Sequence, residues 1–160
     1  MSISPWVVRE AIATDLPAIM QLLALKAAFD GAPESLQATP EQLARDLFGP
    51  SPRCAVLLVE SDGQAIGFAT YHSIYSTFLA KPGLWLDDLF IKEGYRHQGI
   101  GRSLMARLCE IAQRLGCARI DWTVDVVNHS GIQFYQSIGA TVSDQVKLCR
   151  LNQQAIAAAS

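Results

Sequence analysis

The segment 84–115 constrains the fold most, because it has the pattern of a strand, a glycine-containing loop and a long helix in succession. Residues 84–91 are mostly apolar, 92–98 are polar, and Gly99 begins a stretch with helical spacing that Gly116 ends. The apolar side of this amphipathic helix consists of Leu104, Leu108, Ile111 and Leu115. A strand that leads into such a helix is typical of α/β folds.

Shorter patterns fill the rest of the chain. Strands are expected at 6–9, 54–60, 65–72, 119–127 and 141–151, with a hairpin turn at Asp62-Gly63. Helices are expected from Thr14-Asp15 to about residue 28, from Thr39 to residue 48 and at 130–138, while 155–160 is expected to fray. Thr39-Pro-Glu-Gln has the residues of a capping box. The order β-α-α-β-β-β-α-β-α-β predicts one α/β domain over residues 1–160.

Composition excludes several classes of protein. The chain has 160 residues, of which 50% are hydrophobic and 18% charged, as in a globular domain. Its net charge of −2 and the lack of a basic run give no reason to expect nucleic acid or a membrane as partner. The four cysteines lie far apart and the three histidines lack metal-ligand spacing, so we expect no metal and a reduced, cytoplasmic protein. Neither a signal peptide nor a membrane-spanning segment is expected.

The segment 96–102, Arg-His-Gln-Gly-Ile-Gly-Arg, carries the most chemical information. Its two glycines allow backbone N–H groups to approach a ligand, and the start of the following helix adds further donors. Such a group of amides is suited to phosphate or pyrophosphate. An ordinary tight turn is the alternative, and from two glycines alone it is the more common case. The P-loop pattern is absent, and the dinucleotide fingerprint fails because position 104 is Leu.

This segment resembles the acetyl-CoA motif of the GNAT superfamily, [RQ]-x-x-G-x-[GA]. Residues 75–78 (Tyr-Ser-Thr-Phe), 84–91 (Leu-Trp-Leu-Asp-Asp-Leu-Phe-Ile), 94–101 and 127–140 extend the resemblance to the diamine (spermidine/spermine) N-acetyltransferase branch, over nearly the whole chain. The resemblance implies the GNAT fold, with a mixed central β-sheet, flanking helices and strands splayed at the acetyl-CoA site. It also implies acetyl transfer from acetyl-CoA to an amine and, by analogy, a homodimer.

The resemblance assigns the cofactor site and the general acid. In the family the pyrophosphate lies on the loop amides, and the pantetheine arm pairs with the splayed strand. The implied cofactor-binding residues are Leu89, Phe90, Ile91, Arg96, His97, Gln98, Gly99, Ile100, Gly101, Arg102, Asn128, Ser130 and Gly131. Tyr135 has the position of the acid that protonates the departing thiolate, and a phenol suits this role because it stays protonated at neutral pH. The alternative is that its ring packs against a strand.

An amine acceptor requires a carboxylate, because an alkylammonium must be held and then deprotonated before it can attack. Neighbouring strand residues face opposite sides, so only one of Asp87 and Asp88 faces the acceptor. The resemblance selects Asp87, and Asp88 is interpreted as a structural carboxylate bonded to backbone or to an arginine. The other implied acceptor residues are Phe29, Asp30, Trp122 and Asp144.

The acceptor is expected to differ from spermidine. The branch has Glu where this chain has Asp30, Asp87 and Asp144, and the shorter side chain predicts a lysine-like amino acid, thialysine or another diamine. Without a Ser-His-Asp or Cys-His arrangement, direct attack by the amine is favoured over an acyl-enzyme. Two alternatives stay open: an acetyltransferase of protein or antibiotic amines, and an acetyl-CoA sensor without turnover, which would need neither Tyr135 nor Asp87.

Overall fold

The computed structural model describes residues 5–160. They form two compact units, one ending at Thr123 and the other comprising Val124–Ser160. The first unit is built on a five-stranded sheet of order β1-β2-β3-β4-β5, in which β5 runs parallel to β4 and the other neighbours are antiparallel. The strands are β1 (Val7–Glu10), β2 (Ala55–Ser61), β3 (Gln64–Ser76), β4 (Lys81–Ile91) and β5 (Ile120–Asp121).

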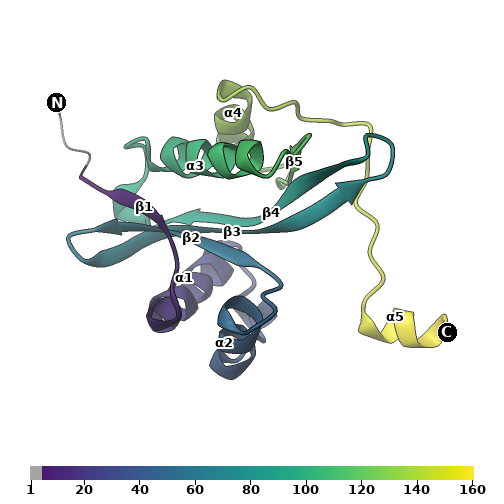
Figure 1. Ribbon diagram of the computed structural model, residues 1–160, viewed down its shortest axis with the longest axis horizontal. Helices are drawn as coiled ribbons and strands as arrows, with labels where there is room; N and C mark the ends of the chain where they lie inside the picture. Colours follow the sequence, from purple (N-terminus) through teal and green to yellow (C-terminus); the bar gives the residue numbers. More distant parts are fainter. Residues whose placement is uncertain (1–4) are drawn as a thin grey trace. The chain divides into compact units, whose positions relative to one another are not determined.

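Helices cover both faces of this sheet. The helices α1 (Leu16–Phe29) and α2 (Pro40–Phe48) lie on one face and α3 (Ile100–Arg114) on the other (Figure 1). Short 3₁₀ turns occupy Ala13–Asp15, Pro33–Ser35 and Glu93–Tyr95. In the second unit the helices are α4 (His129–Ser137) and α5 (Gln153–Ala158). None of the helices in the described chain is both long and apolar enough to cross a membrane.

Each face of the sheet has its own packed layer. Under α1 the buried cluster consists of Ile19, Leu22, Val56, Leu58, Phe68 and Phe90. Under α3 the buried side chains are Ile100, Leu104, Met105, Leu108 and Ile111, which confirms most of the predicted apolar side. Leu115 is 49% exposed, because the helix has already ended and this residue is its cap. The end of β4 takes part in the first layer through Phe90.

Local signals at helix ends were predicted correctly only in part, since Asp15 precedes α1 but makes no side-chain cap hydrogen bond there. The Thr39 hydroxyl accepts a hydrogen bond from the Gln42 amide at 3.2 Å, and the Gln42 side chain accepts one from the Thr39 amide at 3.0 Å. This reciprocal pair is the capping box that the sequence predicted. The fraying expected at 155–160 was wrong: α5 forms there, and the Asn152 side chain caps it by accepting from the Ala155 amide at 2.8 Å.

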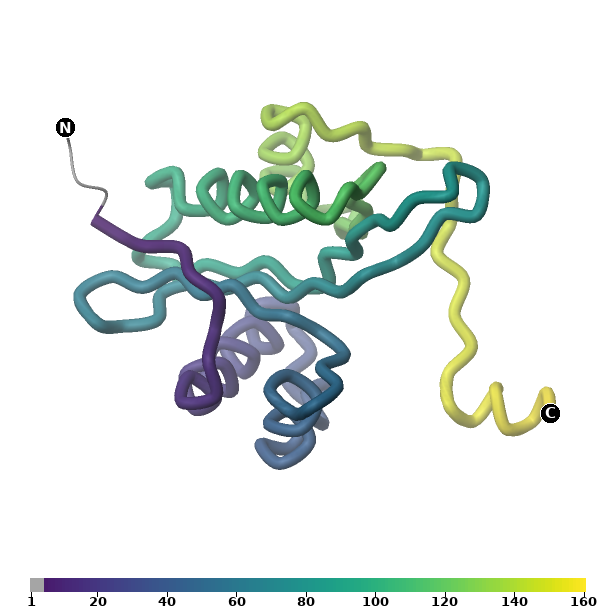
Figure 2. Tube along the Cα trace, in the orientation of Figure 1, coloured from purple at the N-terminus to yellow at the C-terminus, as the bar shows by residue number. Residues whose placement is uncertain are grey.

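The strands differ more from the prediction. The hairpin strands β3 and β4 are longer than expected and extend past their neighbours (Figure 2). The strand expected at 119–127 is reduced to Ile120–Asp121, and the strand expected at 141–151 is absent. Both corrections have one reason, since a strand needs a neighbour for its backbone hydrogen bonds. Among the described residues, β5 pairs with β4 at only two positions, and 141–151 pairs with no strand.

A β-bulge interrupts β4 where the acidic residues lie. Thr70 of β3 pairs with Asp88, while the next residue, Tyr71, pairs with Leu86. Asp87 is therefore the extra residue of the bulge, and it is exposed. Bulges redirect side chains, so the simple alternation assumed for the two aspartates does not hold here.

An ion-pair network joins the first strand to α1. Arg9 of β1 donates to both carboxylate oxygens of Asp15 at 2.7 and 2.9 Å, and to Glu60 at 2.8 and 3.0 Å. Asp15 also accepts from the Ile12 amide at 2.8 Å. The hydrogen bond from Arg9 lowers the pKa of Asp15, against the opposing effect of burial.

Replacing Asp15 by Asn is expected to lower the free energy of unfolding at pH 7 by about 1–2 kcal/mol, because Arg9 loses a charged two-point partner. Since the pKa of Asp15 is lowered by folding, the carboxylate stabilises the protein above the ordinary pKa of about 4 and stops doing so as the pH falls through its folded value. Urea denaturation at several pH values measures both effects, and the difference between the two proteins should shrink towards pH 3. Asp121→Asn, in an exposed pair with Arg119, is the control with little expected loss. Equal losses in both variants would contradict the prediction.

Candidate active site

The loop between β4 and α3 has an unusual backbone conformation. His97 and Gly99 both have left-handed conformations, with φ of 61° and 91°. Such a conformation costs a non-glycine residue about 1–2 kcal/mol, and residues of this kind are concentrated at ligand sites. The first helical bond of α3 runs from the Ser103 amide to the Gly99 carbonyl at 3.0 Å. The preceding amides of Ile100 and Gly101 therefore emerge at the N-terminal end of the helix, where an anion is favoured.

Arg96 connects this loop to β4 by a hydrogen bond. Its Nε donates to the Ile91 carbonyl at 2.9 Å. Its guanidinium lies over the Phe29 ring, 4.4 Å from the centroid, and 5.5 Å from that of Phe90. The Phe29 and Phe90 rings are 6.0 Å apart. One stacked group thus joins the end of α1, the end of β4 and the loop. It contains Phe29, a predicted acceptor residue, together with Phe90 and Arg96, two predicted cofactor residues.

The edge of β4 beside the loop is open on one side. Its pairing with β5 is restricted to Leu84 with Ile120 and Trp85 with Asp121. Further along, residues 89–91 pair only with β3, among the residues that the structure describes. The two parallel strands thus separate after Trp85, as the predicted splayed strands require. Backbone groups on this edge are placed to hydrogen-bond an extended ligand as an added strand would.

Acidic residues gather on the α1 side of β4, with partners that differ from the prediction. Asp88 accepts a hydrogen bond from the Thr70 hydroxyl at 2.7 Å and lies 3.5 Å from the Lys26 ammonium. The same ammonium donates to Asp30 at 2.5 Å. Asp88 is therefore held by a hydroxyl and a lysine, where the sequence suggested backbone or an arginine. Asp87, on the bulge, is exposed.

Sequence reasoning did not identify Lys26 and Thr70. The spacing of Lys26 and Asp30 is i, i+4 on a helix, so this pair had a local signal. The contact between Thr70 and Asp88 depends on strand register, and no local signal reveals it. Burial lowers the pKa of Lys26, but the hydrogen bond that it donates to Asp30 and the charge of Asp88 raise it more, and the net pKa is raised. Lys26 therefore carries its positive charge at neutral pH.

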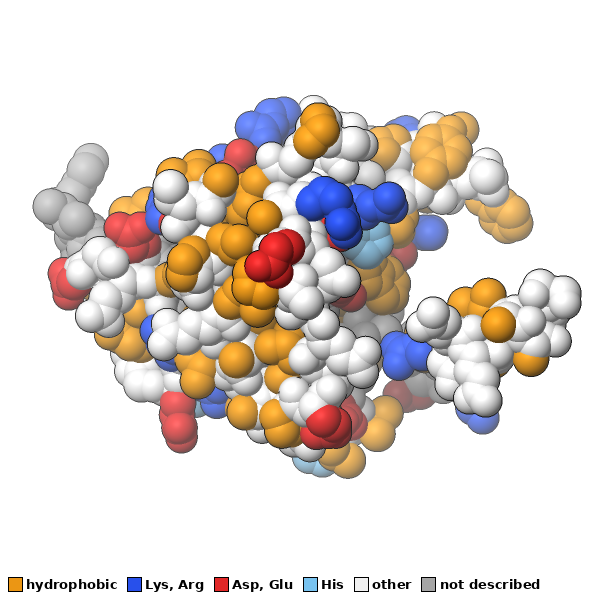
Figure 3. All heavy atoms as spheres, turned by 90° about the horizontal axis from the view of Figure 1, so that it is seen from below, with side chains coloured by type: hydrophobic (Ala, Val, Ile, Leu, Met, Phe, Trp, Pro, Cys, Tyr) orange, Lys and Arg blue, Asp and Glu red, His pale blue; other side chains and the backbone are white. Residues whose placement is uncertain are grey.

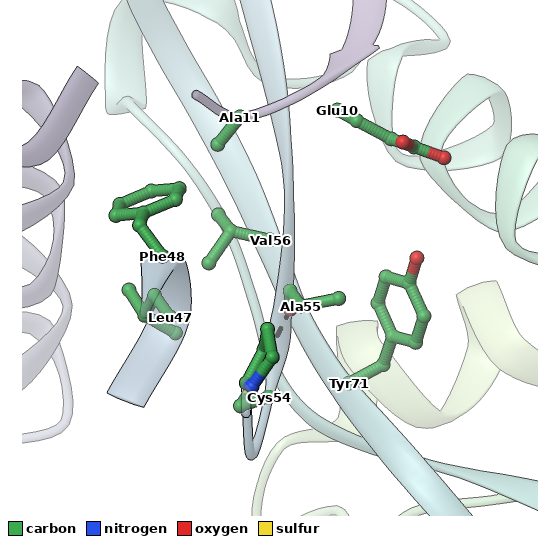
Figure 4. Close-up of a pocket in the computed structure, with 9 residues that line it drawn as sticks. Glu10, Ala11, Leu47, Phe48, Cys54, Ala55, Val56 and Tyr71 are labelled. Atoms are coloured by element: carbon green, nitrogen blue, oxygen red, sulfur yellow. Dashed lines mark hydrogen bonds between the residues drawn. The ribbon is translucent and has the colours of Figure 1, made fainter. Parts of the chain in front are cut away.

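A separate hollow of about 210 Å³ lies where β1 and β2 meet the end of α2. Figure 4 shows Leu47 and Phe48 on one side of β2 and Glu10 and Tyr71 on the other. Cys54 also lines it, and burial first, then the charge of Asp87, raises the pKa of this thiol to about 11. A thiol that stays protonated at neutral pH is a poor nucleophile. None of the predicted site residues lines this hollow.

The remaining predicted residues lie around the end of β5 and in the second unit. Trp122 directly follows β5 and is half-buried. Asn128 caps α4, where its side-chain oxygen accepts from the Gly131 amide at 3.0 Å and from the Ser130 hydroxyl at 3.3 Å. Tyr135 lies on the same helix with its ring 5.2 Å from that of Phe134, and Asp144 is exposed in the segment without a strand.

The crowded cap of α4 also explains Gly131. A Cβ on this residue would lie 2.6 Å from the Asn128 side chain, so a larger residue would displace the cap.

Within the described part of the chain, no three His, Cys, Asp or Glu side chains gather as metal ligands would.

Comparison with known proteins identifies the family. The model of the acetyltransferase (GNAT) family matches residues 17–140, and this range includes β4, the loop 96–102, α3 and α4. The chain belongs to the GNAT acetyltransferase family. The fold is accordingly the mixed α/β GNAT fold that the sequence predicted, with helices on both faces of the sheet.

Curated relatives confirm the predicted branch of the family. The chain is 30% identical to a thialysine N-epsilon-acetyltransferase of Mus musculus, over 83% of this chain and 82% of the relative. It is 31% identical to a spermidine/spermine N(1)-acetyltransferase-like protein of Homo sapiens, over 83% of this chain and 20% of that protein. It is 37% identical to an L-ornithine N5-acetyltransferase of Arabidopsis thaliana, over 61% of this chain and 43% of that protein. The matched segment is thus less than half of the last two proteins.

Solved structures agree on the fold. An integron cassette protein of V. cholerae superimposes with a TM-score of 0.80 at 23% identity, covering 98% of both chains. An aminoglycoside acetyltransferase from an uncultured soil metagenomic sample also reaches 0.80, at 20% identity, over 92% of this chain and 96% of its own. At these identities the likeness concerns the fold alone.

Proposed function

We propose that this protein is an N-acetyltransferase that moves an acetyl group from acetyl-CoA to a primary amine of a small cationic molecule. The observation that carries the proposal is the loop 96–102, whose left-handed His97 and Gly99 open α3 beside the unpaired edge of β4 in a GNAT chain. The loop amides would bind the pyrophosphate. The edge at residues 89–91 would bind the pantetheine arm and donate to the thioester carbonyl.

In the proposed reaction the amine attacks the thioester directly in a ternary complex. Asp87 holds the ammonium and takes its proton, directly or through one water, and the freed nitrogen forms a bond to the carbonyl carbon. Amides of the β4 edge stabilise the negative oxygen while it exists. The carbon–sulfur bond then breaks, the Tyr135 hydroxyl protonates the thiolate, and Tyr135 regains its proton from solvent.

The acceptor that we propose is a lysine- or ornithine-like amine. Curated relatives are named for L-ornithine and thialysine as acceptors. Asp30 and Asp88 beside the end of α1, together with Asp87 on the bulge of β4, would supply the negative charge that an ammonium requires. Phe29 adds an apolar wall for a methylene chain. Trp122 and Asp144 complete the proposed set of acceptor residues.

We also propose that the two units act as one acetyltransferase domain and that the chain forms a homodimer. The family match crosses the boundary at Thr123, which supports one domain. Exposed apolar side chains follow one another in the segment without a strand, where Val146, Leu148 and Leu151 are 75%, 64% and 64% exposed, and a second copy would cover them. Light scattering of the purified protein tests the pairing, and the mass of a single chain would contradict it.

Release of free CoA thiol from acetyl-CoA, measured over a panel of amines, tests the proposed activity. The panel contains ornithine, lysine, thialysine, putrescine, spermidine, a lysine peptide and an aminoglycoside. Turnover is expected to be fastest with ornithine, lysine or thialysine. Preference for the peptide or the aminoglycoside would assign a different acceptor class. Acetyl-CoA binding without thiol release for any amine would identify a sensor and overturn the proposed activity.

A further inference from the structure

Lys26 occupies the carboxylates that an acceptor ammonium would use. Its side chain is 21% exposed and extends from the last turn of α1 to β4. The ammonium donates to Asp30 and lies 3.5 Å from Asp88. Asp88 is in turn held by the Thr70 hydroxyl at 2.7 Å, and Thr70 is buried. A lysine of the protein therefore sits between two of the acidic residues that line the proposed acceptor site.

This arrangement is more than a pair of neighbours on a helix surface. A pair at i, i+4 needs only Lys26 and Asp30. Here the second carboxylate comes from another element, and a buried hydroxyl fixes its position. The raised pKa of Lys26 agrees with a permanent positive charge at this place.

The positive charge of Lys26 affects which amines the proposed acceptor site can bind. Lys26 contacts both Asp30 and Asp88, so these three groups together carry one net negative charge instead of the two of the carboxylates alone. An ammonium of the acceptor that approaches Asp30 or Asp88 meets Lys26 as a like charge in a partly desolvated place, whereas Asp87 is exposed on the bulge.

We propose that Lys26 is a specificity-determining residue that disfavours acceptors with more than one net positive charge, because it pairs with Asp30 and Asp88. Two classes of amine satisfy this limit. One is a monoamine, and the other is a diamino acid whose carboxylate compensates its second ammonium and lies within reach of Lys26. Diamines and polyamines without a carboxylate are selected against. The inference rests on the proposed acetyl transfer and deepens it by naming the charge of the acceptor.

Three acceptors with the same five-carbon chain isolate the effect of charge. Pentylamine and lysine each carry one net positive charge, and cadaverine, which is lysine without its carboxylate, carries two. The measured quantity is kcat/KM for each amine, at one pH and saturating acetyl-CoA. We expect the wild-type protein to prefer lysine and pentylamine over cadaverine. In Lys26→Met the ratio of cadaverine to pentylamine should rise about tenfold or more, because one like-charge contact is removed.

Two variants separate charge from structure. Lys26→Arg keeps the charge and should keep the wild-type ratio. Lys81→Met removes an exposed lysine at the start of β4 and should leave the ratio unchanged. If Lys26→Met lowers the melting temperature, Lys26→Gln replaces it. A ratio that stays within about twofold of wild type in the neutral variants, with all three amines still acetylated, overturns the role of Lys26 alone. No turnover of any of the three amines by the wild type overturns the proposed activity, and this inference with it.

Discussion

Replacing Tyr135 by Phe is expected to lower kcat about 100-fold or more, while the dissociation constant of acetyl-CoA stays within about twofold of wild type. The change removes only the hydroxyl and keeps the ring that packs beside Phe134. Without a proton donor the thiolate must leave unprotonated, which affects the transition state and not the ground state. Steady-state kinetics with the best amine of the panel, together with calorimetric titration of acetyl-CoA, measure the two quantities.

Tyr75→Phe is the matched control for this prediction. It removes the same atom from an exposed tyrosine of β3, which is 64% exposed and not among the proposed site residues. Its kcat should equal that of the wild type. Unchanged turnover in Tyr135→Phe would remove the hydroxyl from the mechanism and support the alternative that the ring only packs. A weakened binding of acetyl-CoA with normal kcat would make Tyr135 a binding residue instead.

The features that the sequence predicted well are local ones. The capping box of Thr39 and Gln42, the start of α3 next to Gly99 and its stop at Gly116 each depend on a few neighbouring residues. The loop 96–102 belongs to this group, because its glycines determine its backbone and the helix that follows determines its donors. Recognition of the family was possible for the same reason.

Features that depend on pairing between distant residues were missed. The composition of 141–151 fits a strand, but no described strand lies beside it, and a strand cannot persist without a partner. The bulge at Asp87 is one extra residue in β4, and it is invisible until the register against Thr70 is known. The stacking of Arg96 on Phe29 likewise joins elements far apart in the chain.

These misses matter for the site because they change the partners of its charged groups. Asp87 and Asp88 do have different environments, since one is exposed and the other is held by Thr70 and Lys26, but the cause is the bulge and not the alternation that the sequence argument assumed. It gave no reason to expect a lysine between Asp30 and Asp88. The resemblance implied an acidic site, whereas only the strand register and the position of α1 reveal that Lys26 pairs with two of the acidic residues.

Gly67→Ala is expected to weaken acetyl-CoA binding about tenfold and to lower the free energy of unfolding by about 1–3 kcal/mol. Gly67 pairs with Ile91 at the end of β4. A Cβ built on it would lie 2.9 Å from the Phe90 carbonyl oxygen and 3.3 Å from the Ile91 side chain. Because the nearest atom belongs to the backbone, β4 itself must move, and with it the edge that is proposed to bind the pantetheine arm.

Gly94→Ala provides the control, because it lies close to the same loop and an added Cβ there meets no atom within 4 Å. Calorimetric titration of acetyl-CoA and urea denaturation of both variants measure the two effects. If Gly67→Ala lost stability but bound acetyl-CoA normally, the edge at 89–91 would not be the pantetheine site, although the packing argument would hold. If both variants weakened binding equally, the sensitivity would belong to the loop as a whole. Only a loss of affinity confined to Gly67→Ala assigns the cofactor to the open edge of β4, since this substitution acts on the strand and leaves the loop residues unchanged.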